Sequence, residues 1–165
     1  DEDSFLLGKE LAKFHDLKVL DLGTGSGYLA EISIKNNCQV LATDINQTAV
    51  DYCKKRGINT IKSNLFSNIH EKFDIIAFNP PYLPLDPEEP KNSRLITTAG
   101  KKGHEIIEKF LKQAKFFLNK NGFILISFSS LSGDIKELFE KYGYNYKQFS
   151  NKKVFFETLY VFMIK

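Results

Sequence analysis

The segment Asn79-Pro80-Pro81-Tyr82 combines two hydrogen-bond acceptors with a stiff loop and an aromatic ring. The side-chain oxygen of Asn79 and the carbonyl oxygen of Pro80 can accept the two N–H hydrogens of a planar amide or amino group. Pro80 and Pro81 fix φ, which favours a pre-oriented pair of acceptors, and Tyr82 offers a flat face for stacking. A plain proline-rich loop after a strand is the structural alternative.

Such a motif suits chemistry at a nitrogen that is a poor nucleophile because its lone pair is delocalised. A catalyst must hold this nitrogen and aim it at an electrophile such as the sulfonium methyl group of S-adenosylmethionine. Asn79 is neutral, so no ionised general base is implied, and the proton can leave after transfer has made the nitrogen acidic. The motif therefore predicts methyl transfer by positioning, with acceptors that strengthen as positive charge develops.

A glycine-rich turn follows the first apolar run of the chain, over residues 21–28. Gly23, Gly25 and Gly27 permit a tight turn and let a ligand approach the backbone, where the next helix offers unpaired N–H groups. A carboxylate at Asp21 would repel a pyrophosphate but could pair with the ammonium group of a methionine moiety. The turn also satisfies the looser dinucleotide pattern G-x-G-x-x-A, so a nicotinamide site is an alternative, as is a purely structural turn.

Two further strand ends carry residues that could hold the same ligand. Asp44 can accept both hydroxyls of a ribose, a feature common to both cofactor interpretations, and we include the adjacent Ile45 in the site. The side-chain oxygen of Asn64 could accept from an adenine amino group, with the N–H of Leu65 near a ring nitrogen. Asn is also a common turn former after a strand, which is the structural alternative for Asn64.

The elements that position these residues follow from the hydrophobic pattern. Apolar runs rich in Val, Ile and Phe alternate with segments of helical period, which predicts a doubly wound α/β domain over residues 1–165, with helices on both faces of a parallel sheet. Strands are expected at Lys18–Leu22, Gln39–Thr43, Asn59–Ser63, Phe73–Phe78 and Gly122–Ser127. Helices are expected at Asp3–Phe14, Ser26–Lys35, Asn46–Arg56, Gly103–Leu118 and Gly133–Tyr142. Two closing strands, Asn145–Phe149 and Phe156–Lys165, should form a hairpin with its turn at Ser150–Lys153.

With these motifs the chain resembles the class I methyltransferases, and specifically the HemK-type protein-glutamine methyltransferases that act on translation release factors. The resemblance covers nearly the whole chain, because Glu2–Leu7 and Ala99–Gly103 match the family as well as the glycine turn, Asp44 and the Asn-Pro-Pro-Tyr motif. It implies a Rossmann-like, seven-stranded and mostly parallel sheet with a C-terminal antiparallel hairpin.

The resemblance also implies a role for individual residues. Ser4 would contact the carboxylate of the donor, Asp21 and Gly23 its methionine part, Asp44 the ribose, Asn64 and Leu65 the adenine, and Asn79 the substrate glutamine. The family usually has Asp in place of Asn64 and often Thr in place of Ser4. Both residues keep an acceptor or a hydroxyl, so these departures bear on affinity more than on activity.

The chain looks like the compact archaeal and eukaryotic subtype of this family, which lacks the additional amino-terminal helical domain of the bacterial members. Members of that subtype commonly pair with a small zinc-binding activator protein, and the resemblance implies such a partner here. The strand Asn59–Ser63 should lie at an edge of the sheet, open to pairing with a partner, although most edge strands are only solvated.

The composition argues against several other classes. The 21 Lys and two Arg are dispersed and form no basic block that would follow a phosphate backbone, so nucleic acid is not favoured. Apolar runs stay far below the roughly 20 residues of a membrane span, and Cys38 and Cys53 have no disulfide or metal spacing. We expect a cytoplasmic enzyme without a metal. Two alternatives stay open: an adenine-N6 or guanine-N2 methyltransferase of RNA or DNA, and a partner-dependent module that binds S-adenosylmethionine.

Overall fold

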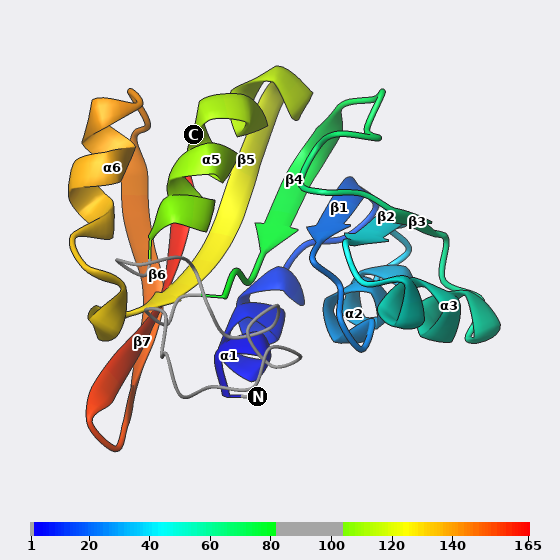
Figure 1. Cartoon of the computed structure of the whole chain (residues 1–165), viewed down its shortest axis with the longest axis horizontal. Helices are drawn as coiled ribbons and strands as arrows, with labels where there is room; N and C mark the ends of the chain where they lie inside the picture. Colours follow the sequence, from blue (N-terminus) through cyan, green and yellow to red (C-terminus); the bar gives the residue numbers. More distant parts are fainter. Residues whose placement is uncertain (1, 82–103) are drawn as a thin grey trace.

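A computed structural model describes residues 2–81 and 104–165 of the 165-residue chain. The strands form one seven-stranded sheet in the order β3-β2-β1-β4-β5-β7-β6 (Figure 1). Strands β1 to β5 are parallel, whereas β7 runs antiparallel to both β5 and β6. The expected doubly wound sheet with a closing antiparallel hairpin is therefore confirmed.

The bounds of the elements agree with the expected segments to within a few residues in most places. The strands are β1 (Lys18–Leu22), β2 (Gln39–Asp44), β3 (Thr60–Lys62), β4 (Phe73–Phe78), β5 (Leu118–Ser129), β6 (Tyr146–Val154) and β7 (Glu157–Ile164). The helices are α1 (Glu2–Leu11), α2 (Tyr28–Lys35), α3 (Gln47–Lys55), α5 (Glu105–Ala114) and α6 (Ile135–Lys141), with short 3₁₀ turns η1 (Lys115–Phe117) and η2 (Ser130–Ser132). None of these helices is long and apolar enough to cross a membrane.

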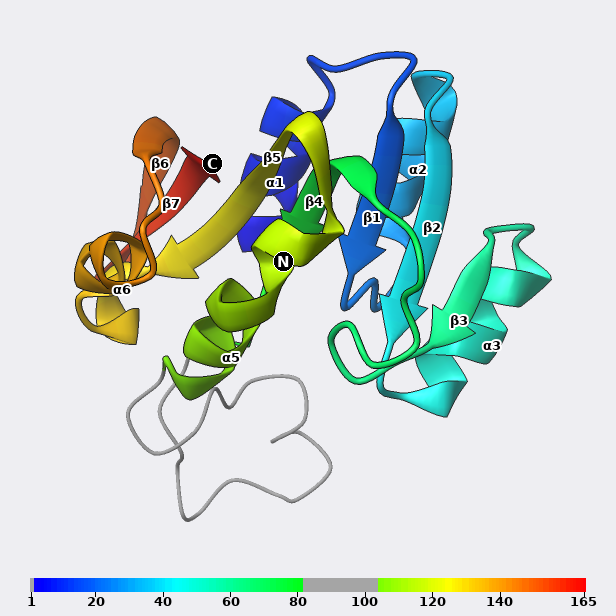
Figure 2. The ribbon, with the colours of Figure 1, turned by 90° about the horizontal axis from the view of Figure 1, so that it is seen from above.

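Helices cover both faces of the sheet, with α1, α2 and α3 on one face and α5 and α6 on the other (Figure 2). Successive residues of β4 alternate between the two layers, because side chains of a strand point to opposite faces. Ile75 and Ala77 pack with the α1 and α2 layer, and Ile76 and Phe78 pack with the α5 and α6 layer. A strand that is buried on both sides needs an unbroken apolar run, which is why these strands were recognisable in the sequence.

The expected turn at Ser150–Lys153 is wrong. β6 continues to Val154 and β7 begins at Glu157, so the chain reverses at Phe155 and Phe156. The polar run belongs to an edge strand that, among the described strands, pairs with β7 alone and exposes Lys152 and Lys153. Lysines are common on edge strands because they discourage pairing with other chains, so polarity here marked an edge and not a turn.

Two further boundaries differ from those expected. α2 begins at Tyr28 instead of Ser26, because Gly27 has a φ of 83°, which no right-handed helix accommodates. β5 begins at Leu118, so Gly122 lies inside the strand instead of opening it. A Cβ atom at Gly122 would lie 2.8 Å from the carbonyl oxygen of Phe73, so the glycine permits a close approach of two backbones.

Candidate functional site at the carboxyl edge of the sheet

Three neighbouring strands end at the same level and carry the residues that were predicted to bind the donor and the substrate. Leu22 at the end of β1 is in register with Thr43 of β2 on one side and with Phe78 of β4 on the other. The next residue along each strand is therefore Gly23, Asp44 or Asn79. The parallel topology thus brings the glycine turn, the Asp44 carboxylate and the Asn-Pro-Pro segment to one edge, the usual place for a ligand in an open α/β sheet.

The glycine turn is held to β2 and leaves open space beside part of its backbone. The N–H groups of Gly23 and Thr24 both donate to the carbonyl oxygen of Thr43, each at 2.8 Å. Gly23 and Gly25 have φ angles of 74° and 53°, and a Cβ atom at either position would meet no atom of the described chain within 4 Å. Gly27 differs, since its Cβ would lie 2.6 Å from the Ile58 side chain, so Gly27 serves packing.

Asp21 places a carboxylate beneath this turn with one oxygen unsatisfied. Its Oδ2 accepts from the Thr24 hydroxyl at 2.6 Å and from the Ala30 N–H at 3.1 Å. Its Oδ1 is buried and receives no hydrogen bond from the described residues. Burial raises the pKa of Asp21 from 3.8 to about 6; the two hydrogen bonds oppose this rise and the nearby Asp44 adds to it. A buried carboxylate with an unpaired oxygen fits a cationic ligand group such as an ammonium.

Asp44 is fixed by the backbone on both sides. Its Oδ2 accepts from the N–H of Gly25 at 2.9 Å, and its Oδ1 accepts from the N–H of Asn46 at 2.8 Å. A carboxylate oxygen has two lone-pair sites, so each oxygen can still accept from a ligand hydroxyl. The adjacent Ile45 side chain is 45% exposed, which leaves an apolar surface beside the carboxylate.

Asn64 and Leu65 follow β3, one strand beyond Asp44. The N–H of Ser63 donates to the carbonyl oxygen of Asp44 at 2.9 Å, which brings the two strand ends side by side. Asn64 is exposed, its N–H donates to the Ser67 hydroxyl at 3.1 Å, and Leu65 has a φ of 48°. Both residues therefore lie at the same edge as the glycine turn.

Asn79 is held at both ends of its side-chain amide. Its Nδ2 donates to the Ser4 hydroxyl of α1 at 2.9 Å, and its Oδ1 accepts from the Ser127 hydroxyl of β5 at 2.6 Å. An amide oxygen has two lone pairs, so Oδ1 can accept one more hydrogen bond. Pro80 is buried and Pro81 half-buried, whereas Tyr82 lies outside the described residues, as does the segment Ala99–Gly103.

Ser127 is the site residue that the sequence analysis missed. It is only 1% exposed, lies 48 residues from Asn79, and follows four apolar residues of β5. Its neighbour Ile126 is in register with Phe78, the residue before Asn79. A hydroxyl at that level of the adjacent strand is the signal that could have identified it, since a buried hydroxyl requires a hydrogen-bond partner.

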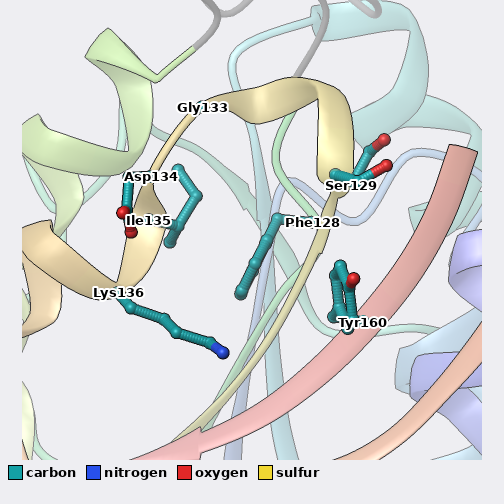
Figure 3. Close-up of a pocket in the computed structure, with 8 residues that line it drawn as sticks. Phe128, Ser129, Gly133, Asp134, Ile135, Lys136 and Tyr160 are labelled. Carbon is teal, nitrogen blue, oxygen red and sulfur yellow. The ribbon is translucent and has the colours of Figure 1, made fainter.

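A hollow of about 390 Å³ lies beyond this site, between β7 and the start of α6 (Figure 3). Phe128 and Tyr160 contribute aromatic rings to its lining, and Asp134 and Lys136 contribute charged groups. Ser127 contacts Asn79, whereas Phe128 packs with the α5 and α6 layer on the opposite face of β5. Neither Asn79 nor Ser127 lines the hollow, which is therefore separate from the Asn79 site. Within the described ranges no cluster of His, Cys, Asp and Glu could hold a metal ion.

Comparisons with known proteins identify the family of the chain. The model of the family "Methyltransferase small domain" matches residues 1–156. A Methanocaldococcus jannaschii protein, provisionally assigned as a protein N5-glutamine methyltransferase, is 36% identical over 97% of this chain and 87% of its own length. A release factor glutamine methyltransferase of Streptococcus pneumoniae is 33% identical over 77% of this chain, which spans only 51% of that relative.

A solved structure is similar over the full length of the chain. The Mtq2–Trm112 complex of E. cuniculi, which methylates the translation termination factor eRF1, matches with a TM-score of 0.82 and 28% identity. The match covers 100% of this chain and 95% of the matched chain. The sheet order and the family match together lead to one assignment. The chain belongs to the methyltransferase small domain family, among the class I methyltransferases that depend on S-adenosylmethionine.

Proposed function

We propose that this protein methylates the side-chain nitrogen of a glutamine in a translation release factor, with S-adenosylmethionine as the donor. The observation that carries the proposal is the Asn79 amide, fixed by Ser4 and Ser127 at the level of the glycine turn and Asp44. The relatives of M. jannaschii and S. pneumoniae support glutamine as the acceptor, and the Mtq2 structure supports a translation termination factor as the substrate.

The donor would bind to the residues that lie at the carboxyl edge of the sheet. Oδ1 of Asp21 would receive the donor's ammonium group, Ser4 would contact its carboxylate, and the backbone at Gly23 and Gly25 would line the methionine part. Asp44 would accept the ribose hydroxyls, with Ile45, Asn64 and Leu65 around the adenine. When bound, the donor supplies an electrophilic methyl group on a positively charged sulfur.

The protein's own part in the reaction is positioning. Oδ1 of Asn79 and the carbonyl oxygen of Pro80 would accept the two N–H hydrogens of the glutamine amide, and Tyr82 would stack on its plane. Ser4 and Ser127 fix the plane of the Asn79 amide, so that its oxygen does not reorient during the reaction. The acceptors strengthen as positive charge develops on the nitrogen, which then loses a proton.

Asp44→Ala is expected to weaken donor binding roughly 10- to 100-fold, because two hydrogen bonds to a charged acceptor disappear. At saturating donor, kcat should fall much less, since Asn79 is untouched. Calorimetric titration with S-adenosylmethionine measures the change. The control is Asp74→Ala, which removes a strand carboxylate bonded to the Lys18 N–H and to Asn119, away from the site. Equal donor affinity in wild type and Asp44→Ala would show that the ribose assignment is wrong.

Ser127→Ala is expected to lower kcat roughly 10-fold or more, because the Asn79 amide loses the donor that fixes its oxygen. Donor affinity should stay within about twofold, and Ser127→Thr should restore activity because it retains the hydroxyl. Ser33→Ala is the matched control, since Ser33 is also a buried serine but its hydroxyl donates to the Leu29 carbonyl within α2. The same loss of kcat in the Ser33 variant would mean that Ser127 acts only through stability.

The proposed function is tested by transfer of labelled methyl groups to release factor, its Gln→Ala variant, RNA and DNA, offered side by side. Incorporation of label into wild-type release factor alone supports the glutamine assignment. Incorporation into nucleic acid would instead identify adenine or guanine as the methyl acceptor. The assay is run with and without a small zinc-binding activator of the Trm112 type. We propose such a partner because β3 is an edge strand and Mtq2 is found with Trm112.

A further inference from the structure

We propose that the tip of the β6–β7 hairpin, Phe155 and Phe156, is a docking element for the protein substrate. It would insert into an apolar pocket with an acidic rim on that protein. The inference rests on the proposed function, because it concerns how a folded substrate is held while its glutamine lies at Asn79.

The tip exposes an unusual pair of aromatic rings. Phe155 is 90% exposed and Phe156 is 99% exposed, the two highest values among the exposed large hydrophobic residues of the described chain. Isolated apolar side chains are common on protein surfaces, but two adjacent rings that the described residues leave uncovered form a contact surface. Aromatic side chains that bury a large area at low entropic cost are typical anchors of protein interfaces.

The sequence of the tip does not suit the turn that it makes. Val154 pairs with Glu157, so the loop has two residues, which usually include Gly, Asn or Asp. Phe155 instead adopts a φ of 48°, a conformation that is uncommon for a bulky side chain. Turn formation therefore does not account for these two residues, and a contact outside the chain does.

The hairpin is tied to both elements that hold Asn79. The Lys152 ammonium pairs with Glu2, two residues before Ser4 on α1. On the other side, the Ser129 hydroxyl donates to Glu157, and Ser129 lies two residues after Ser127 on β5. The hairpin is thus connected to α1 and β5, the two elements that hold the Asn79 side chain.

The distance from the site to the tip suits a macromolecule. Val161 of β7 lies opposite Ser127, and Phe156 lies five residues from Val161, which amounts to about 17 Å along the strand. Figure 1 shows the hairpin turn projecting beyond the carboxyl ends of β1 and β4. A small molecule at Asn79 would not reach the tip, whereas a folded protein that presents a glutamine loop would.

The charge around the tip specifies the chemistry of the partner. β6 has the sequence Tyr-Lys-Gln-Phe-Ser-Asn-Lys-Lys-Val, with three lysines and no acidic residue. Of these lysines, Lys153 lies beside the tip and is exposed, Lys152 pairs with Glu2, and Lys147 lies at the far end of β6. The carboxylate of Glu157, at the start of β7, accepts a hydrogen bond from the Ser129 hydroxyl. Electrostatic complementarity therefore favours acidic side chains around the pocket that receives the rings.

The test replaces the tip by a sequence that suits the turn better. The double variant Phe155→Asn, Phe156→Gly creates an Asn-Gly loop, so the hairpin should be retained and Tm should not fall. With release factor as substrate we expect KM to rise at least about 10-fold, while kcat at saturation and S-adenosylmethionine affinity by calorimetry stay within about twofold. Phe116→Ser is the matched control, because Phe116 is 74% exposed in η1, before β5 begins, and its loss should leave KM unchanged.

Several outcomes would overturn the inference. An unchanged KM in the double variant, or an equal rise of KM in Phe116→Ser, would show that the tip does not bind the substrate. A parallel loss of kcat and donor affinity would show that the tip has a structural role. If light scattering shows a wild-type dimer that the double variant no longer forms, the tip binds a second copy of this chain and not the substrate. If wild-type protein does not methylate release factor, the proposed function itself fails and the docking inference fails with it.

Discussion

Asn79→Ala is expected to lower kcat about 100- to 1,000-fold while donor affinity stays within about twofold. The substitution removes the one side-chain acceptor that is fixed at the carboxyl end of β4, and losses of this size follow when a preorganised hydrogen-bonding group is deleted. The donor pocket should persist, because Gly23, Asp21 and Asp44 are held by Thr43, Thr24 and backbone N–H groups and not by Asn79. Single-turnover methyl transfer and calorimetry separate the two effects.

The control for this variant is Asn119→Ala. Asn119 also has a partly buried amide that joins two strands, since its Nδ2 donates to Asp74 at 2.8 Å. It lies at the start of β5, at the opposite edge of the sheet from Asn79. Loss of Asn119 should reduce stability without a specific loss of kcat. Wild-type turnover in Asn79→Ala would contradict the proposed mechanism. A large loss of kcat in Asn119→Ala would mean that the assay reports folding.

Much of the site could be predicted because its residues are tied to strand ends. β1, β2 and β4 are buried on both faces and therefore read as short apolar runs, and each ends directly before Gly23, before Ile45 or before Asn79. In a parallel sheet, strand ends that face the same way must lie together, so sequence order alone predicts their proximity. Ser127 was missed because it belongs to no motif and lies inside β5, and its place beside Asn79 depends on the register of β5 against β4.

The closing hairpin illustrates a different limit. Polar and apolar residues usually separate turns from strands, but an edge strand can be polar and a turn can be apolar when it has another role. Lys152 and Lys153 lie in β6, and Phe155 and Phe156 form the turn, so both local signals pointed the wrong way. The unpaired Oδ1 of Asp21 could not be predicted from the sequence either, since only the three-dimensional arrangement reveals which oxygen has a partner.

Asp21 connects ligand binding to stability, and its raised pKa determines in which direction stability changes with pH. Between about pH 4 and pH 6 the folded chain keeps a proton on Asp21 that the unfolded chain has released. The stabilising contribution of this protonated carboxyl is complete below pH 4 and is lost as the pH rises through 6. The rise of the pKa from 3.8 to about 6 corresponds to about 3 kcal/mol, so at pH 8 the ligand-free protein carries a destabilising buried charge of that order.

Asp21→Asn is therefore expected to stabilise the ligand-free protein at pH 8 by about 2 kcal/mol, and not at pH 4. The gain is smaller than 3 kcal/mol because the new amide N–H₂ group, in place of Oδ1, finds no acceptor among the described residues. Urea unfolding at both pH values measures the difference. Thr24 and Ala30 can still donate to the amide oxygen, so the turn should keep its shape.

The same variant should bind S-adenosylmethionine roughly 100-fold more weakly at pH 7, because the ammonium group loses its counter-charge. In wild type, affinity should fall below pH 6 as Asp21 takes up its proton, while the variant should show no such dependence between pH 5 and 7. Calorimetric titration across this range tests both statements. A buried carboxylate that destabilises the free protein and strengthens ligand binding is the behaviour expected of a binding group. A variant that is less stable at pH 8 but binds the donor normally would instead assign Asp21 to the architecture of the turn.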